Sequence, residues 1–375
     1  MTVEPLPPPV WVDEPVSLKR MVDDLSAQKR IAVDTESNSL HAYREQVCLI
    51  QFSTPERDYV LDPLAFEDLQ SLAPLFASPH IEKVFHAAEY DLICLKRDYG
   101  FEFKRLFDTM QAARILGYPF VGLDALLKEK FQVRVDKRHQ KADWAARPLT
   151  PAQLDYARMD THYLLPLRDL LEDELHEKGR WGYALDDFSL ACRVNEPKEK
   201  TNGSSWKRFG NRKDITPREL TILRELCLCR DAIAESMNRP PFKVISDSVL
   251  LDIAKNPPEK DVDLAAIGLS QKQIHLWGEQ ILAATRRGMK NPLVRAEQAE
   301  PPKEAVIRRL DKLKSWRKKV AEGMKVESDI VLPKGLLHML AEQPPKNLDE
   351  LRTMMCESPF RFEQYGEQIF QLIGR

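Results

Sequence analysis

Two carboxylates follow a short apolar run near the start of the chain. Asp34 and Glu36 come after Ile31-Ala32-Val33, whose β-branched residues are typical of a buried strand. Side chains two positions apart on an extended backbone face the same side, about 6–7 Å apart along the strand. Carboxylate oxygens are the ligands that Mg²⁺ and Mn²⁺ prefer. The pair therefore predicts half of a divalent metal site at the end of a strand.

The spacing of Asp34 and Glu36 is not specific by itself. Aspartate and glutamate make up 58 of the 375 residues, so about nine acid-x-acid pairs are expected by chance in such a chain. A polar strand end explains the pair equally simply. The metal-site prediction therefore depends on further acids that the fold would have to bring to the same place.

A third carboxylate, Asp91, lies where a strand passes into a helix. A short strand is expected at residues 83–85, His86 follows it, and an apolar helical pattern begins near Leu92. Asp91 therefore lies in the first turn of the helix. The helix dipole favours a carboxylate there, so a capping role and a metal-ligand role are both open. His86 either forms a hydrogen bond with a backbone carbonyl or contacts a substrate.

A fourth carboxylate and a tyrosine lie on a later helix. Residues 150–153, Thr-Pro-Ala-Gln, form a capping box with proline at the first helical position, which defines where this helix begins. Tyr156 and Asp160 are four residues apart and share one face of the helix. The same spacing recurs at Tyr183 and Asp187, but glycines interrupt the helical pattern there. We therefore prefer the first pair.

The elements that position these side chains alternate between strand and helix. Strands are expected at residues 31–33, 47–52, 58–61 and 83–85, and helices at 15–28 and 66–76, after residue 88 and after residue 150. Asp108 is expected to cap one further helix and not to bind a metal. This order predicts an α/β or α+β domain with a central mixed sheet.

Four carboxylates without lysines among them would repel one another unless cations lie between them. Two divalent ions about 3.5–4 Å apart suit in-line attack on a phosphodiester, because one activates water and the other stabilises the leaving oxygen. Tyr156 has an unperturbed pKa of about 10 and is protonated at neutral pH. We therefore expect its hydroxyl to orient the attacking water. The residues indicate two-metal phosphodiester hydrolysis.

Residues 137–149 form a polar, basic segment that is long for a connection between elements. Trp144 and Arg147 are the side chains in it that we expect to contact nucleic acid. A solvated loop anchored by its tryptophan explains the same segment equally well. Both interpretations stay open at this point.

The second half of the chain has a different composition. Residues 193–213 are rich in Asn, Lys, Glu, Gly and Ser, which is typical of a linker. A capping box at residues 216–219 then begins an all-helical region. Residues 230–237 recur at 317–324, and Gly-Glu-Gln-Ile at 278–281 recurs at 366–369. The repeat predicts two related helical domains joined near Pro301-Pro302.

Composition limits the classes of function. The net charge of −2 excludes a uniformly basic protein that coats nucleic acid, so binding would need local patches. The basic residues at 308–319 form either a solvated helix face or a phosphate-binding surface. There is no apolar run of membrane-spanning length, and the six cysteines lack zinc-finger spacing. The first residues do not show the basic-then-apolar pattern of a secretory signal, so we expect none. We expect a cytoplasmic protein with no membrane partner.

Three motifs in order resemble those of a known nuclease family. Asp34-x-Glu36, His86-x-x-x-x-Asp91 and Tyr156-x-x-x-Asp160 are similar to the exonuclease motifs of the tyrosine-type DEDD nucleases. Arg147-Pro148-Leu149 and the repeated helical domain resemble bacterial ribonuclease D in particular. The C-terminal modules of that family are called helicase-and-RNase-D C-terminal (HRDC) domains. The resemblance covers residues 10–373.

The resemblance implies an RNase H-like mixed-sheet exonuclease domain followed by two all-α HRDC-like domains. It further implies a 3′-to-5′ exoribonuclease that trims single-stranded 3′ ends of structured RNA, tRNA precursors above all, and releases nucleoside monophosphates. The implied cofactor is two Mg²⁺ or Mn²⁺ ions, bound by Asp34, Glu36, Asp91 and Asp160. We favour a monomer. The expected boundaries are 1–192 for the exonuclease domain, 193–213 for the linker, and 214–295 and 303–375 for the helical domains.

Two other functions remain open on the residues alone. A DNA 3′-5′ exonuclease would use the same carboxylates, because no residue that we can name senses a 2′-hydroxyl. A noncatalytic RNA-binding adaptor on a nuclease-like fold would use the helical domains instead. The four intact carboxylates argue against the adaptor. Turnover on matched single-stranded RNA and DNA would separate the two nucleases.

Overall fold

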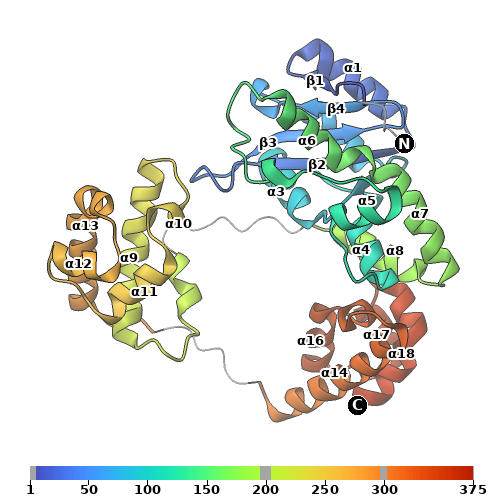
Figure 1. Ribbon diagram of the computed structural model, residues 1–375. Helices are drawn as coiled ribbons and strands as arrows, with labels where there is room; N and C mark the ends of the chain where they lie inside the picture. Colours follow the sequence, from blue (N-terminus) through green and yellow to red (C-terminus); the bar gives the residue numbers. More distant parts are fainter. Residues whose placement is uncertain (1–5, 195–203, 296–301, 375) are drawn as a thin grey trace. The chain divides into compact units, whose positions relative to one another are not determined.

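The computed structural model describes residues 6–194, 204–295 and 302–374 (Figure 1). The chain divides into two compact units, which we describe separately. Within the described residues, unit 1 comprises 6–37, 47–194 and 302–374, and unit 2 comprises 38–46 and 204–295. Unit 1 therefore contains the second helical repeat and the predicted nuclease region apart from residues 38–46, which belong to unit 2.

A mixed sheet forms the centre of unit 1. The described part of the chain gives it six strands in the order β1-β4-β3-β2-β5-β6. The strands are β1 (Val10–Val12), β2 (Arg30–Ser37), β3 (Val47–Ser53), β4 (Asp58–Leu61), β5 (Glu82–Phe85) and β6 (Leu106–Asp108). Strand β2 lies between β3, with which it pairs antiparallel, and β5, with which it pairs parallel. The predicted mixed sheet is confirmed, and the strand of Asp34 and Glu36 lies inside it.

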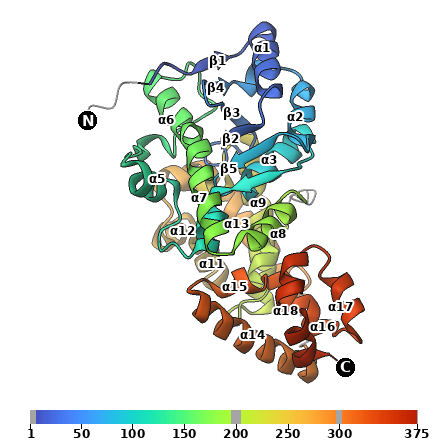
Figure 2. The same cartoon turned by 90° about the vertical axis from the view of Figure 1, so that its right-hand side faces the viewer.

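Helices cover both faces of this sheet (Figure 2). One side is covered by α1 (Pro15–Ser26), α2 (Ala73–Ala77) and α3 (Glu89–Tyr99), and the other by α6 (Pro151–His162) and α7 (Leu164–Glu177). The remaining helices of this region are α4 (Thr109–Leu116), α5 (Leu123–Phe131) and α8 (Trp181–Ala191), with short 3₁₀ helices at Pro63–Ala65, Gln70–Leu72 and Lys137–His139. Burial of the apolar faces of sheet and helices produces a large core, and a smaller separate cluster lies between β3, β4 and α6.

The helix predicted at residues 66–76 is wrong in extent. The structure has a 3₁₀ helix, Gln70–Leu72, followed by the short helix α2, Ala73–Ala77. Pro74 lies in the first turn of α2, where its missing N–H is not needed. Its ring would clash with a carbonyl four residues earlier in a continuous helix, which explains the break.

Unit 2 contains the first helical repeat. Its helices are α9 (Pro217–Ser236), α10 (Pro241–Val244), α11 (Asp247–Lys255), α12 (Asp261–Ile267) and α13 (Gln271–Lys290). The predicted capping box of Thr216 and Glu219 begins α9. The predicted linker lies partly outside the described residues. Its described end forms a 3₁₀ helix, Ser205–Phe209, whose Phe209 is buried in the core of this unit.

The second helical repeat consists of α14 (Glu304–Met324), α15 (Ser328–Val331), α16 (Lys334–Glu342), α17 (Leu348–Met354) and α18 (Pro359–Ile373). Corresponding arginines make the same contact in both copies. Arg230 Nη1 donates to the Ile245 carbonyl at 3.1 Å, and Arg317 Nη1 donates to the Leu332 carbonyl at 2.8 Å. The sequence repeat is therefore a structural repeat.

Arg361 attaches the second repeat to α8. Its side chain is completely buried and pairs with Asp186 (Nη1 to Oδ2, 3.3 Å) and Asp187 (Nη2 to Oδ1, 2.8 Å). The same guanidinium donates to the Ile330 carbonyl at 2.9 Å and lies over the ring of Tyr183. The buried guanidinium of Arg361 therefore pairs with two aspartates of α8.

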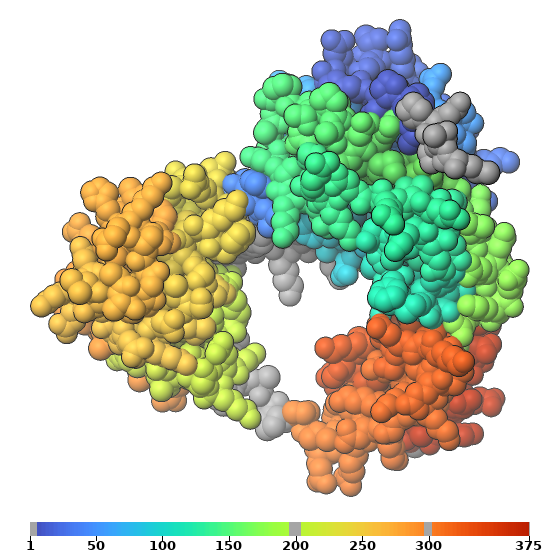
Figure 3. Space-filling view, viewed as in Figure 1, coloured from blue at the N-terminus to red at the C-terminus, as the bar shows by residue number. Residues whose placement is uncertain are grey.

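A second set of contacts ties the same repeat to α4. Arg114 pairs with Glu327 at 2.6 Å and with Asp329 at 2.7 Å. Arg180 donates to the carbonyls of Ile115 and Met324 and so joins the two segments. Figure 3 shows the orange and red C-terminal region directly against the teal and green part of unit 1. The second repeat is part of the unit that carries the sheet.

The described residues also show whether a helix could span a membrane and how the cysteines are placed. No helix in residues 6–194, 204–295 or 302–374 is both long and apolar enough to cross a membrane. The six cysteines are free thiols. Cys94 and Cys227 are buried in helices, whereas Cys229 is only partly buried.

Replacing Arg361 with Ala should strongly destabilise unit 1. The substitution leaves Asp186 and Asp187 without their buried cation, and removing one partner of a buried ion pair costs about 3–5 kcal/mol. Urea unfolding of the full chain measures the change. Arg308→Ala, at an exposed position of α14, is the control and should change the unfolding free energy by less than about 0.5 kcal/mol. Equal stability of both variants would contradict the role assigned to Arg361.

Candidate active site

The four predicted carboxylates lie close enough to repel one another. Burial raises the pKa of Asp34 well above its ordinary value, and the charges of Asp91, Asp160 and Glu36 raise it further. Burial raises the pKa of Glu36 to about 9, with added repulsion from Asp160 and Asp91. The structure thus brings together acids from β2, α3 and α6.

Strand β2 supplies Asp34, Thr35 and Glu36 in three successive positions. The side chains of Asp34 and Glu36 alternate with that of Thr35, as the strand periodicity requires. The Thr35 hydroxyl donates a hydrogen bond to Asp91 Oδ1. This bond lowers the pKa of Asp91, but burial outweighs it and raises that pKa to about 7. Thr35 therefore attaches α3 to the strand, a contact that our reading of the sequence missed.

Asp108 holds the backbone that leads into α3. It caps α4, as predicted, by accepting hydrogen bonds from the amides of Met110 (2.8 Å) and Gln111 (3.2 Å). It also accepts hydrogen bonds from the amides of Ala87 (3.0 Å) and Ala88 (2.9 Å). Ala87 has a φ of +62°, a left-handed conformation that is unfavourable for alanine. One buried carboxylate thus fixes the turn that places Asp91.

Helix α6 supplies Tyr156 and Asp160. Its predicted capping box is present, since Thr150 accepts a hydrogen bond from the Gln153 amide and the Gln153 side chain accepts one from the Thr150 amide. Burial raises the pKa of Asp160 to about 7, with repulsion from Asp91. Burial and the nearby charges of Asp160, Glu36 and Asp34 raise the pKa of Tyr156 above its ordinary value. The phenol is therefore protonated at neutral pH.

His86 directly follows β5, and its ring forms a hydrogen bond within the protein. Its Nδ1 lies 2.9 Å from the Thr109 hydroxyl, which in turn donates to the Phe85 carbonyl at 3.1 Å. Burial lowers the pKa of His86, so the ring is neutral at physiological pH. Its partner is a side-chain hydroxyl and not the backbone carbonyl considered from the sequence. Contact with nucleic acid stays a prediction.

Trp144 is 1% exposed in the loop that follows α5. Its ring stacks on Tyr156 with centroids 5.9 Å apart and an interplanar angle of 26°. The buried indole therefore packs against the ring of Tyr156, the candidate catalytic tyrosine. A base could not stack on this ring without movement of the loop, and the predicted nucleic-acid contact stays a prediction.

Arg147 holds the same loop against the sheet. Its guanidinium forms two hydrogen bonds with Asp62, Nε to Oδ2 at 2.6 Å and Nη2 to Oδ1 at 2.7 Å. It also donates to the carbonyls of Cys48 (2.9 Å) and Trp144 (2.7 Å). Its donors are thus used within the protein. The structure gives Arg147 a loop-anchoring role, and its predicted role in nucleic-acid binding is not tested.

The carboxylates could hold divalent cations by their chemistry. Four acids from three elements offer hard oxygen ligands, and cations would relieve their repulsion. As the side chains are placed, the described residues contain no group of three or more His, Cys, Asp or Glu arranged to hold a metal ion. Side-chain torsions give these carboxylates other orientations to adopt.

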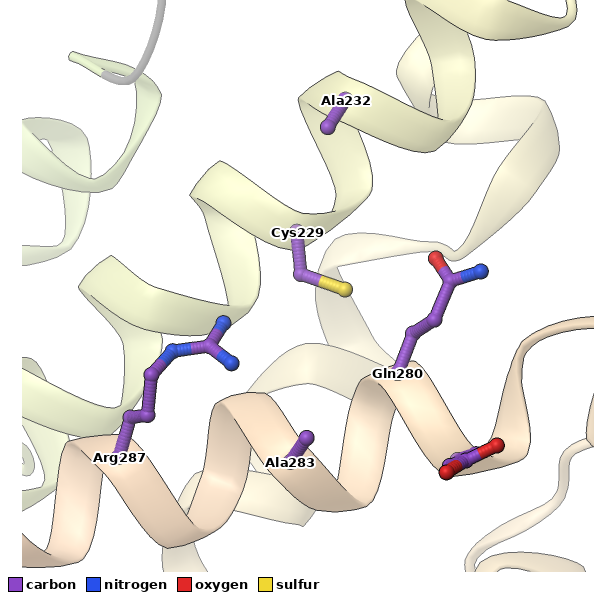
Figure 4. Close-up of a pocket in the computed structure, with 6 residues that line it drawn as sticks. Cys229, Ala232, Gln280, Ala283 and Arg287 are labelled. Carbon is purple, nitrogen blue, oxygen red and sulfur yellow. The ribbon is translucent and has the colours of Figure 1, made fainter.

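A separate hollow lies in unit 2 between α9 and α13 (Figure 4). It has a volume of about 380 Å³ and is lined by Cys229, Ala232, Glu279, Gln280, Ala283 and Arg287. Arg287 Nε donates to Glu225 at 3.2 Å, so the arginine already has an acidic partner. The hollow contains none of the predicted site residues, and we assign it no chemistry.

Comparisons with known proteins identify the kinds of domain in this chain. Residues 9–176 match the 3′-5′ exonuclease family model, and residues 219–285 and 307–373 match the HRDC domain. Ribonuclease D of Pseudomonas paraeruginosa is 28% identical over 88% of each chain. The crystal structure of Escherichia coli RNase D superposes with a TM-score of 0.69 and 25% identity, covering 98% of this chain and 100% of that chain.

Eukaryotic relatives share only part of their length with this chain. Exosome complex exonuclease RRP6 of Saccharomyces cerevisiae is 35% identical over 69% of this chain, which is 37% of RRP6. The matched region spans about a third to a half of the first RRP6-like relatives. The fold and the matches define a 3′-5′ exonuclease domain combined with two HRDC domains. Residues 9–176 therefore belong to the 3′-5′ exonuclease family, and the chain is similar to ribonuclease D over most of its length.

The metal-free protein should lose stability as the pH rises from about 5 to 9. The folded pKa values of Glu36 (about 9), Asp91 and Asp160 (about 7) lie above those of unfolded acids, about 4. The folded state binds more protons, so this contribution is full below pH 4 and is lost as the pH passes through 7 to 9. Melting temperatures in EDTA measure the effect.

Asp34→Asn should reduce this decline, because one interacting charge is removed. Asp155→Asn is the control, since Asp155 lies on α6 but its side chain is 62% exposed and pairs with Arg158. Its decline should match that of the wild type. A pH-independent melting temperature in the unsubstituted protein would contradict the electrostatic description of the site.

Proposed function

We propose that this protein removes nucleotides from the 3′ end of RNA and releases nucleoside 5′-monophosphates. The observation that carries the proposal is the meeting of Asp34, Glu36, Asp91 and Asp160 beside Tyr156 in a 3′-5′ exonuclease domain. Lysines are absent from the groups that shift these pKa values among the described residues. The site is thus built to receive external positive charge.

We infer that these four carboxylates would hold two divalent ions, Mg²⁺ or Mn²⁺. When bound, such ions lower the pKa of water and neutralise charge on the leaving oxygen of a phosphodiester. The protein contributes the orientation of the ligands. Thr35 fixes one oxygen of Asp91, and Asp108 fixes the turn before it, so Asp91 approaches the β2 carboxylates from a defined direction.

Tyr156 contributes a protonated hydroxyl beside the carboxylates. Because its pKa is raised, the phenol does not act as a general base at neutral pH. Its O–H can instead donate to one group and accept from another, which orients the attacking water. Stacking against Trp144 limits the motion of the ring. Tyr156 is therefore proposed to position the nucleophile and not to deprotonate it.

Structured RNA, including tRNA precursors, is the proposed substrate class. Support comes from similarity to Escherichia coli RNase D, which is described as an exoribonuclease involved in structured RNA processing. The similarity to ribonuclease D of Pseudomonas paraeruginosa also favours RNA over DNA. We further propose a monomer in the cytoplasm, where the six free thiols would stay reduced.

Asp34→Asn should reduce hydrolysis of a single-stranded RNA oligonucleotide to background at saturating Mg²⁺. The amide removes a charged metal ligand and leaves the fold of β2 unchanged. Release of nucleoside monophosphates, followed by chromatography, measures the effect, and Asp155→Asn should retain wild-type activity. Full activity of Asp34→Asn would exclude Asp34 from the site. Faster cleavage of matched DNA by the wild type would instead favour a DNA exonuclease.

Tyr156→Phe should lower kcat by about 10²-fold, because a misplaced nucleophile costs about that much. KM should change little, since the ring and its stacking on Trp144 remain. Steady-state kinetics on a short RNA separates the two constants. A wild-type kcat would remove the hydroxyl from the mechanism, while a raised KM with normal kcat would make it a substrate-binding group.

A further inference from the structure

Gln51 is a buried amide without a partner. It lies in the middle of β3 and is 0% exposed. Neither Nε2 nor Oε1 has a hydrogen-bond partner among the described residues. Leaving a buried polar group unpaired costs about 1–3 kcal/mol, so such a group requires an explanation.

The strand register places Gln51 beside the predicted active site. Gln51 lies directly opposite Asp34 in the antiparallel β2–β3 pair. Side chains directly opposite each other in such a pair point to the same face, with Cβ atoms about 4.5–5.5 Å apart. The amide of Gln51 and the carboxylate of Asp34 therefore share one face of the sheet.

Helix α6 covers that face of β3. Ser53, two residues after Gln51 and on the same face, donates to Asp58 and contacts the Thr161 hydroxyl of α6, both at 2.7 Å. Leu49, two residues before Gln51, packs in one cluster with Ala157 of α6. The side chain of Gln51 thus lies next to Asp34 on the face of the sheet that α6 covers, and α6 supplies Tyr156 and Asp160.

An amide is chemically suited to this position. It is neutral, so it adds no charge to a cluster of four acids, and its Nε2 carries two N–H donors. Carboxylates that bind metals are themselves held by hydrogen bonds from neighbouring groups, which orient them. A donor opposite Asp34 is what such an arrangement needs.

We propose that Gln51 is a positioning residue for Asp34. Its Nε2 donates to one carboxylate oxygen of Asp34 when Asp34 turns to bind a divalent ion, which leaves the other oxygen for the ion. This inference rests on the proposed metal-dependent function. It adds a residue that none of the sequence motifs contains.

Gln51→Met tests the proposal, because methionine keeps a similar length and volume but cannot donate. Titration of the full chain with Mn²⁺ at fixed pH, followed by calorimetry, should show a Kd raised about 10- to 100-fold. The melting temperature in EDTA should stay the same or rise, because an unpaired buried amide is removed. Activity lost at low Mn²⁺ should recover at high Mn²⁺. Gln51→Leu should show the same rise in Kd and the same melting temperature in EDTA as Gln51→Met.

Ser53→Ala is the matched control on the same face of β3. It removes the hydrogen bonds to Asp58 and Thr161, so it should lower the melting temperature and leave the Mn²⁺ affinity unchanged. Wild-type Mn²⁺ affinity in both Gln51 variants would overturn the role of Gln51 and leave the proposed function intact. Failure of the unsubstituted protein to bind Mn²⁺ would overturn both.

Discussion

Mutual repulsion among four partly or fully buried carboxylates is the constraint on which the site depends. Burial and neighbouring acids raise the pKa values of Asp34, Glu36, Asp91 and Asp160 together, so each charge makes the others harder to maintain. The acids come from three elements of one rigid sheet-and-helix arrangement. The fold therefore has to hold them together against an electrostatic force that favours their separation until positive charge arrives.

Neutral hydrogen-bond donors supply much of that restraint. The Thr35 hydroxyl and the backbone amides that bind Asp108 hold α3 in place without adding charge to the cluster. On the opposite side, Arg147 and Trp144 fix the loop beside Tyr156, with the arginine charge directed at Asp62 and not at the four acids of the candidate site. These groups thus hold the candidate site in place without neutralising the negative charge of its four carboxylates.

Local sequence rules predicted the features that depend on adjacent residues. The strand of Asp34, the caps formed by Thr150 and Asp108, and the common face of Tyr156 and Asp160 all follow from spacing within a few positions. The internal repeat is also visible in sequence, because it preserves residues at fixed separations. The residue types and motif order were sufficient to indicate the reaction class.

Features that depend on strand register and on distant pairing could not be predicted. Gln51 reads as one polar residue in an apolar strand, and only the pairing with β2 places it opposite Asp34. The contacts of Arg147 with Asp62 and of Arg361 with Asp186 join residues far apart in the chain. Nothing in the local sequence indicated that the second HRDC domain packs on α8.

The order of segments in unit 1 has a consequence for folding during synthesis. Helix α8 is made before the first helical repeat, whereas Arg361, which pairs with its two aspartates, is made near the end of the chain. At about 5–20 residues per second, the ribosome needs on the order of 10 s to supply the missing region. During this time the surface of α8 that carries Asp186 and Asp187 stays exposed in the nascent chain. Unit 1 is complete only when α18, which carries Arg361, has been made.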